Sequence, residues 1–200
     1  MGSGGKVSKR VSTLDPLAIW ADSGVLTTTR MLYLGGEISQ ESVDIVIKGI
    51  LALESLDPTG KITLILSSEG GAYYPALALY DALRATSCPT TIKVLGHCMS
   101  SAVVILQGAD HRVISENARI LIHDGTEGYE GEARNFEKWG KQCVLDRQLM
   151  YDIFASRSKC DQKWFDRNCQ HDKFLTPTEC ISLGLADEIL TKYVQQGETP

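Results

Sequence analysis

The stretch VLGHCMSSAVVIL, residues 94–106, runs from an expected strand into an expected buried helix. Two adjacent serines, Ser100 and Ser101, stand at this junction, beside His97 and Cys98. Serine is a preferred helix N-cap, which is the simpler interpretation of the pair. The N-terminus of a helix also favours negative charge, so a serine there is well placed to act as a nucleophile. The stretch alone leaves both interpretations open.

Strand and helix signals alternate on both sides of this stretch. Strands are expected at 30–38, 61–68, 90–96, 118–125 and 186–192. Helices are expected at 39–57, 72–86, 101–109, 131–157 and 176–184. Ser39 and Thr176 are the expected N-caps, and Glu179 completes a capping box with Thr176. Such an alternation with short connections predicts an α/β fold with a largely parallel sheet.

Three features follow expected strands, where parallel sheets gather reactive groups. They are the pair Gly70-Gly71, the turn 96–101 and His123. Two glycines allow a backbone to approach a ligand closely, but they also suit an ordinary tight turn. A lone histidine is more often structural than catalytic. Each feature is weak by itself.

Other polar groups compete for roles in chemistry. His97 and His111 are weaker candidates for a base, because the first lies in the serine turn and the second in an expected solvated loop. Cys98 is a rival nucleophile, although a partly buried thiol is usually inert. Asp172, just before an expected helix, suits a solvated turn.

Composition and charge narrow the class of protein. The chain has 200 residues, 43% of them hydrophobic, which suggests one domain, and its formal net charge is −5. The sequence has no basic cluster that would suggest nucleic acid, and no apolar run near the ~20 residues of a membrane span. Without a secretory signal, the expected location is the cytoplasm, or an organellar stroma or matrix if a transit peptide was removed. The six cysteines, some near His171, match no common zinc spacing, so free thiols and no metal are expected.

Several segments together resemble one known family, the proteolytic subunits of the Clp protease. They are RMLYLGGEI (30–38), ILSSEGGAYYPALALYDAL (65–83), GHCMSSA (96–102), NARILIHDGTEGYEGEA (117–133) and HDKFLTPTECISLGLADEIL (171–190). The resemblance implies a protease domain over 30–195, with the spiral of repeated β-β-α units that this family shares with crotonases and a protruding handle helix. Segment 1–29 matches poorly and is expected to form an axial loop or a tail.

The resemblance also implies a serine endopeptidase that uses no cofactor. Ser100, four residues after Gly96, matches the nucleophile, His123 the base and Asp172 the acid that orients it. The N–H groups of Gly71 and Ser101 match the oxyanion hole. The expected substrate-binding residues are Gly70, Gly125, Thr126, Glu127 and Gly128. The family implies heptameric rings stacked as a tetradecamer, with a ring-shaped ATPase unfoldase that delivers unfolded polypeptides.

The chain departs from the family pattern at a few positions. Glu69 stands where proline is usual, and Asp124 and Gly125 replace the usual glutamine and proline after His123. Asp124 is therefore a local rival of Asp172 for orienting His123. The alternatives are a stand-alone protease of the same fold, such as a phage head-maturation enzyme, a catalytically weak ring subunit, and a crotonase-type acyl-CoA enzyme.

Overall fold

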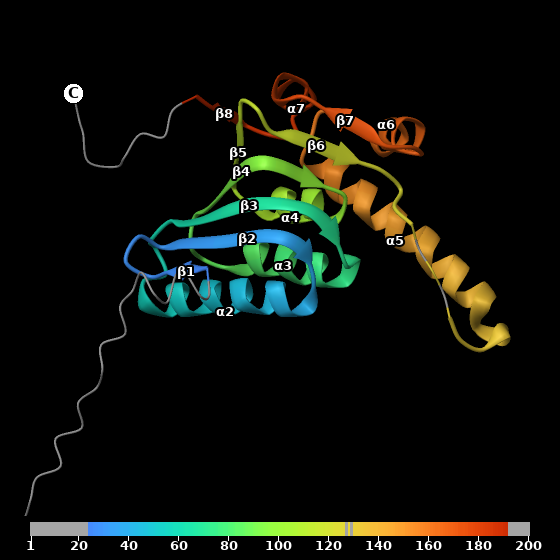
Figure 1. The fold of residues 1–200 in the computed structure, drawn as a ribbon, viewed down its shortest axis with the longest axis horizontal. Helices are drawn as coiled ribbons and strands as arrows, with labels where there is room; N and C mark the ends of the chain where they lie inside the picture. The colour runs from blue at the N-terminus through green and yellow to red at the C-terminus, as the bar shows by residue number, and fades with distance from the viewer. Residues whose placement is uncertain (1–23, 127, 129, 192–200) are drawn as a thin grey trace, which may run out of the picture.

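The computed structural model describes residues 24–126, 128 and 130–191 (Figure 1). The strands are β1 (Val25–Leu26), β2 (Met31–Ile38), β3 (Ile62–Gly71), β4 (Thr90–Met99), β5 (His111–Ser115), β6 (Arg119–Ile122), β7 (Lys173–Leu175) and β8 (Glu188–Leu190). The α-helices are α2 (Gln40–Leu56), α3 (Tyr73–Ala85), α4 (Ser101–Gly108), α5 (Phe136–Ser156), α6 (Gln162–Asn168) and α7 (Pro177–Leu183). A short 3₁₀ helix, Ala133–Asn135, precedes α5. The expected α/β class is confirmed.

The sheet is largely parallel, as the alternation predicted. Its strand order is β1-β2-β3-β4-β5-β8, and β6 joins it through β4. Only β1 with β2 and β6 with β7 pair antiparallel among the described strands. The consequence for function is that β3, β4 and β6 run in the same direction and end at the same side of the sheet.

Strand β4 pairs with different strands along its length, and this arrangement positions the site. Its first half pairs with β5, from Thr91 opposite His111 onward. Its last three residues pair with β6 instead, with Met99 opposite Leu121. Gly96 lies between the two halves with a φ of +73°, a conformation that glycine adopts without strain. The turn after β4 is thereby placed beside the end of β6.

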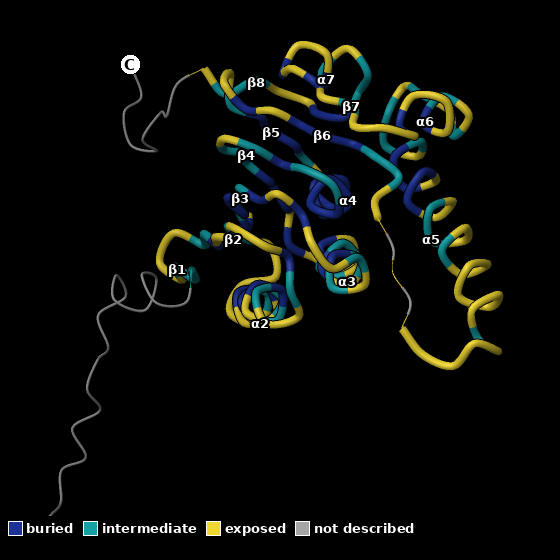
Figure 2. Tube along the Cα trace, turned by 45° about the vertical axis from the view of Figure 1, so that its right-hand side comes forward, coloured by how far each residue is buried: buried dark blue, intermediate teal, exposed yellow. Residues whose placement is uncertain are grey.

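Helices α2, α3 and α4 pack beside strands β2–β5, whereas α5 projects away from them (Figure 1). All eight residues of α4 are buried, which explains why its sequence is apolar on every side. Only the C-terminal part of α5 enters the core, through Met150, Tyr151, Ile153 and Phe154. Its projecting part is exposed in Figure 2 and carries five exposed apolar side chains: Phe136, Trp139, Val144, Leu145 and Leu149.

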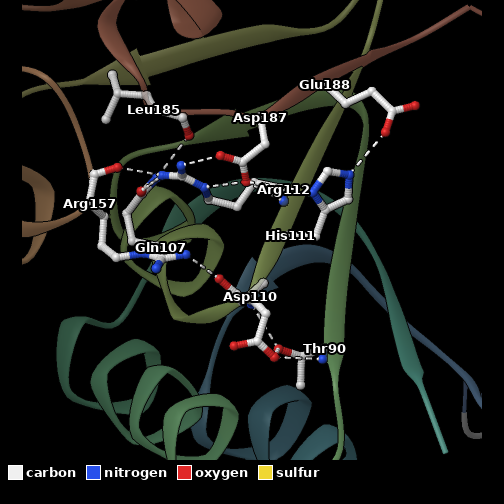
Figure 3. Close-up of polar contacts among 10 residues, drawn as sticks. Thr90, Gln107, Asp110, His111, Arg112, Arg157, Leu185, Asp187 and Glu188 are labelled. Carbon is white, nitrogen blue, oxygen red and sulfur yellow. Dashed lines mark hydrogen bonds and ion pairs between the residues drawn. The ribbon is translucent and has the colours of Figure 1, made fainter.

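The prediction of a solvated loop around His111 is wrong, because residues 111–115 form β5. The charged residues that suggested a loop are paired: Arg112 is 5% exposed and contacts Asp187 at 2.6 Å. Arg112 also donates to the main-chain oxygen of Arg157 at 2.8 Å and to Gln107 (Figure 3). These four residues, the Arg112 network, join α4, β5, the end of α5 and the segment before β8.

Other boundaries shift in smaller ways. Asp172 does not directly precede a helix, because β7 lies between it and α7. Helix α6 was not predicted, although Asp161 caps it by accepting a hydrogen bond from the Trp164 N–H at 2.8 Å. Both expected N-caps are confirmed, since Ser39 accepts from the Ser42 N–H and Thr176 from the Glu179 N–H.

The described residues also bear on membranes, metals and thiols. No helix among them combines the length and apolarity that crossing a bilayer requires. Within the same residues, no three His, Cys, Asp or Glu side chains gather as a metal-binding group. All six cysteines are free thiols, as expected.

Candidate active site

Ser100 occupies the turn between β4 and α4 in an unusual conformation. Its φ of +54° and ψ of −128° lie outside the regions that non-glycine residues favour. In the described part of the chain, Arg30 is the only other non-glycine residue with a positive φ. No capping hydrogen bond from the Ser100 side chain is found there, so the N-cap interpretation of this side chain is wrong. Strain of this kind persists where the surrounding structure enforces it, often at functional sites.

The hydroxyl of Ser100 points to His123 instead. The Oγ atom lies 2.8 Å from His123 Nε2. Two main-chain contacts hold the serine in place: its N–H donates to Leu121 at 2.9 Å, and its carbonyl accepts from the Val103 N–H at 3.0 Å. The first contact links the serine turn to β6, the strand that ends just before His123.

Asp172 lies on the other side of the imidazole. Its Oδ1 atom is 3.0 Å from His123 Nδ1. The antiparallel pairing of β6 with β7 explains this proximity, because Ile122 lies opposite Lys173 and the next residues outward are His123 and Asp172. The His123 side chain is 27% exposed and that of Asp172 is 61% exposed. Asp172, His123 and Ser100 therefore form one hydrogen-bonded line that begins near solvent.

Gly70 and Gly71 end β3 where it meets the serine turn. Their φ values are +100° and +144°, which strain any other residue. A Cβ on Gly70 would lie 2.7 Å from the Ser100 Cβ, and one on Gly71 would lie 2.4 Å from the Ile38 oxygen. The Ser101 hydroxyl donates to the Gly71 carbonyl at 3.1 Å. Glycine at position 70 thus lets the β3 backbone approach Ser100, and glycine at position 71 avoids a collision with β2.

Two hollows adjoin this line of residues. One, of about 450 Å³, lies between α3 and α5 and is lined by Gly71, Tyr73, Tyr74, Thr126, Gly128, Trp139 and Asp146, among others. The other, of about 470 Å³, is lined by His123, Gly125, Thr126 and Asp172, among others. Of the expected substrate-binding residues, Gly70 abuts Ser100, and Gly125, Thr126 and Gly128 line the hollows. Glu127 lies outside the described residues.

Asp124 does not face the imidazole as a rival of Asp172. Its Oδ2 atom is 3.2 Å from Arg147 Nη1, and its Oδ1 atom accepts a hydrogen bond from the Tyr151 hydroxyl. Sequence reasoning missed Arg147 and Tyr151. Their spacing of four residues in an expected helix places them on one face, which was the available signal.

The remaining candidates from the sequence are placed elsewhere. Cys98 is fully buried, and burial raises the pKa of its thiol, so it is a poor nucleophile. His97 lies 3.6 Å from Glu69, and His111 lies 2.9 Å from Glu188. Burial also raises the pKa of the Cys169 and Cys180 thiols to about 12, so both stay protonated near neutral pH.

Comparisons with known proteins agree with the family resemblance of the sequence. A sequence model of the family described as Clp protease matches residues 18–193. The chain is 28% identical over 167 residues to the ATP-dependent Clp protease proteolytic subunit of Deinococcus radiodurans, covering 82% of each chain. It is 28% identical to proteolytic subunit 2 of Streptomyces avermitilis, covering 84% of this chain and 85% of that one. It is 31% identical to proteolytic subunit 1 of Rhodococcus jostii, covering 80% of this chain and 74% of that one.

Proposed function

Because the chain belongs to the Clp protease family and is a serine-type endopeptidase, we propose that Ser100, His123 and Asp172 are its catalytic triad. The observation that carries this assignment is the hydrogen-bonded line of 2.8 Å and 3.0 Å through the two ring nitrogens of His123. A nucleophile, a base and a group that orients the base must lie within such distances of each other.

The reaction follows from this geometry. His123 Nε2 takes the proton of Ser100 as Oγ attacks the carbonyl carbon of a peptide bond. Asp172 holds the His123 tautomer whose Nδ1 carries a proton, and it stabilises the imidazolium that forms. His123 then gives its proton to the leaving amine, and a water molecule hydrolyses the acyl-enzyme by the same steps in reverse order.

The oxyanion is proposed to accept hydrogen bonds from the N–H groups of Gly71 and Ser101. Ser101 is the first residue of α4, and the first N–H groups of a helix have no partner within it. Gly71 is the last residue of β3, and the Ser101 hydroxyl joins the two segments through the Gly71 carbonyl. Donors fixed before the reaction stabilise the developing charge without reorganisation.

The substrate is proposed to be an unfolded polypeptide that binds along residues 125–128 and places one side chain in the hollow between α3 and α5. The residues that line this hollow include Gly71, at the proposed oxyanion site, and the aromatic residues Tyr73 and Trp139. Aromatic walls favour an apolar side chain at this position.

Proteolytic subunits of this family generally form rings and work with ATPases. We extend this to the present chain as two stacked heptameric rings, which enclose the Ser100 sites, and a ring-shaped ATPase partner. The exposed apolar side chains on the projecting part of α5 support assembly, because a patch of this kind is typical of an interface.

A fluorophosphonate probe tests the triad directly. The assembled protein should be labelled, and peptide mapping should place the label on Ser100. Ser100→Ala should abolish labelling, whereas Ser101→Ala should retain it. Labelling at Ser101 or Cys98 would overturn the assignment. A stable folded protein, incubated without ATP, tests the enclosed chamber, because its rapid degradation would favour a stand-alone protease.

A further inference from the structure

Asp124, the residue after His123, ties the end of β6 to α5. Arg147 and Tyr151 donate to different oxygens of its carboxylate, Arg147 at 3.2 Å. The two donors stand one helical turn apart on α5, so both reach the same carboxylate. We call these three residues the Asp124 clamp. The Asp124 and Arg147 side chains are 24% and 37% exposed, so the clamp is partly shielded from water.

The backbone of Asp124 makes a second link. Its N–H donates to the carbonyl of Cys169 at 2.9 Å. Cys169 is fully buried at the end of α6 and lies three residues before Asp172. One residue therefore connects the segment that carries His123, the segment that carries Asp172 and helix α5.

Tyr151 gives the clamp a fixed support. The residue is 2% exposed, and its ring stacks on that of Phe165 with ring centroids 5.9 Å apart. Burial, together with the hydrogen bond to Asp124, raises the pKa of Tyr151, so its hydroxyl stays protonated and remains a donor. Hydrogen bonds to a charged acceptor are roughly twice as strong as neutral ones. The Asp124 carboxylate is thus held by a rigid phenol and a charged guanidinium.

The triad itself needs external support. The Asp172 side chain is 61% exposed, so packing contributes little to its position. His123 is the first residue after β6, beyond the ladder of paired strands. Contacts with residues outside the triad must therefore hold His123 and Asp172 at their distances from each other and from Ser100.

We propose that Asp124 is a positioning residue for peptide hydrolysis, holding His123 and Asp172 in line with Ser100 through its contacts with α5 and with Cys169. This rests on the proposed triad, since it concerns how the same three residues are aligned. Asp124 does not exchange a proton with the substrate. Its effect is expected on kcat rather than on KM, because misplacement by about 1 Å can cost about 10²-fold in rate.

Steady-state kinetics on a short fluorogenic peptide, with the intact assembled protein, tests the clamp. Asp124→Ala should lower kcat by about tenfold to a hundredfold and leave KM within about twofold. Tyr151→Phe removes one hydroxyl from a buried ring and should lower kcat less, by about three- to tenfold. The matched control is Asp44→Asn on α2, where the carboxylate lies 4.0 Å from Lys48, and it should keep full activity.

Conservative variants separate positioning from a general structural role. Arg147→Lys keeps a cation and should retain more activity than Arg147→Met, which keeps only the aliphatic stem. The double variant Asp124→Ala with Tyr151→Phe should be no slower than Asp124→Ala alone, because both act through one carboxylate. Multiplicative losses would contradict a single clamp.

Crystal structures provide a readout that does not depend on turnover. Tyr151→Phe, which serves even if Asp124→Ala does not fold, should show a longer Ser100 Oγ to His123 Nε2 distance than 2.8 Å. An unchanged distance with unchanged kcat in that variant would overturn the clamp and leave the triad assignment intact. Full activity in Ser100→Ala would instead overturn the proposed function.

Discussion

Helix α5 is held to the body of the protein at several places, and two of them use an arginine with an aspartate. Near the site, Arg147 contacts Asp124 at 3.2 Å in a partly exposed setting. At the end of the helix, Arg112 donates to the Arg157 carbonyl and contacts Asp187 at 2.6 Å, with its own side chain only 6% exposed. The first contact lies one residue from the proposed base, whereas the second lies in the Arg112 network, which contains none of the triad residues (Figure 3).

The difference shows that two similar arginine–aspartate pairs can have different effects, depending on their burial and on their distance from the site. A buried charge that loses its partner costs several kcal/mol, so the Arg112 network should control stability. A partly exposed pair contributes little to stability but can still fix the geometry of its neighbours. Substitutions at the site end of the sheet, which includes the Asp124 clamp, should therefore lower kcat. Substitutions at the far end, in the Arg112 network, should lower the free energy of unfolding.

The largest rate effect is expected at Ser100. Ser100→Ala should lower kcat by about 10⁶-fold, because the attacking atom is lost. Its free energy of unfolding should stay near that of the wild type, since the side chain makes no cap. Peptide hydrolysis and urea unfolding measure the two quantities, and a large loss of stability would break the division between the two ends.

Asp172→Asn should lower kcat by about 10⁴-fold, because the amide no longer favours the productive His123 tautomer. Combining it with His123→Ala should make the enzyme little worse than His123→Ala alone, since triad residues act as a unit. The kcat values of the three variants decide this. Multiplicative losses would mean that Asp172 acts independently of His123.

At the far end, Arg112→Met should lower the free energy of unfolding by about 1–3 kcal/mol, because it removes the donor to buried Gln107 and the guanidinium that Asp187 contacts. The folded fraction should keep kcat within about twofold. Urea unfolding, followed by peptide hydrolysis below the transition, measures both. A large fall in kcat at unchanged stability would show that this network also aligns the site.

The stabilising contribution of Asp187 should depend on pH. Burial acts to raise its pKa, but the hydrogen bonds and charge of Arg112 outweigh burial and hold the pKa below its ordinary value. This contribution is fully present above the unfolded value of about 3.9 and is lost as pH falls through the folded pKa. The unfolding free energies of wild type and Asp187→Asn should therefore differ at pH 7 and converge in acid. A gap that stays constant would contradict this assignment.

The smallest effect is expected at Ser101. Ser101→Ala removes the hydrogen bond to the Gly71 carbonyl but keeps the backbone N–H. A single neutral hydrogen bond contributes about 1 kcal/mol, which corresponds to a kcat about fivefold lower. If Ser101→Ala were inactive and Ser100→Ala active, the nucleophile would be assigned one residue too early.

Much of the site was accessible from sequence because its main residues follow strands. The glycine pair, the serine turn and His123 all end parallel strands, and pattern alone places such ends together. Asp172 required the family resemblance, because the short strand β7 that brings it to His123 has too few residues to show alternation. The clamp escaped prediction since Asp124 was considered only as a partner of its neighbour His123.

The fold was accessible where apolar periodicity was strong, as in α2, or where an apolar run was continuous, as in β3 and α4. Strand β5 was missed because its arginine looked solvated, and the contacts that make its burial favourable include the Arg157 carbonyl and Asp187, both far along the chain. Long-range polar pairing of this kind leaves no local pattern.

The antiparallel pairing of β6 with β7 has a consequence for the order in which the protein becomes active during synthesis. The ribosome releases Ser100 and His123 well before Asp172, which lies 49 residues beyond His123. A nascent chain of that length thus contains the proposed nucleophile and base but lacks the acid proposed to orient the base. Because synthesis runs from the N-terminus, Asp172 is the last of the three residues to arrive, and β7 cannot pair with β6 before then. The line of hydrogen bonds from Asp172 through His123 to Ser100 can therefore form only after residue 172 has been synthesised.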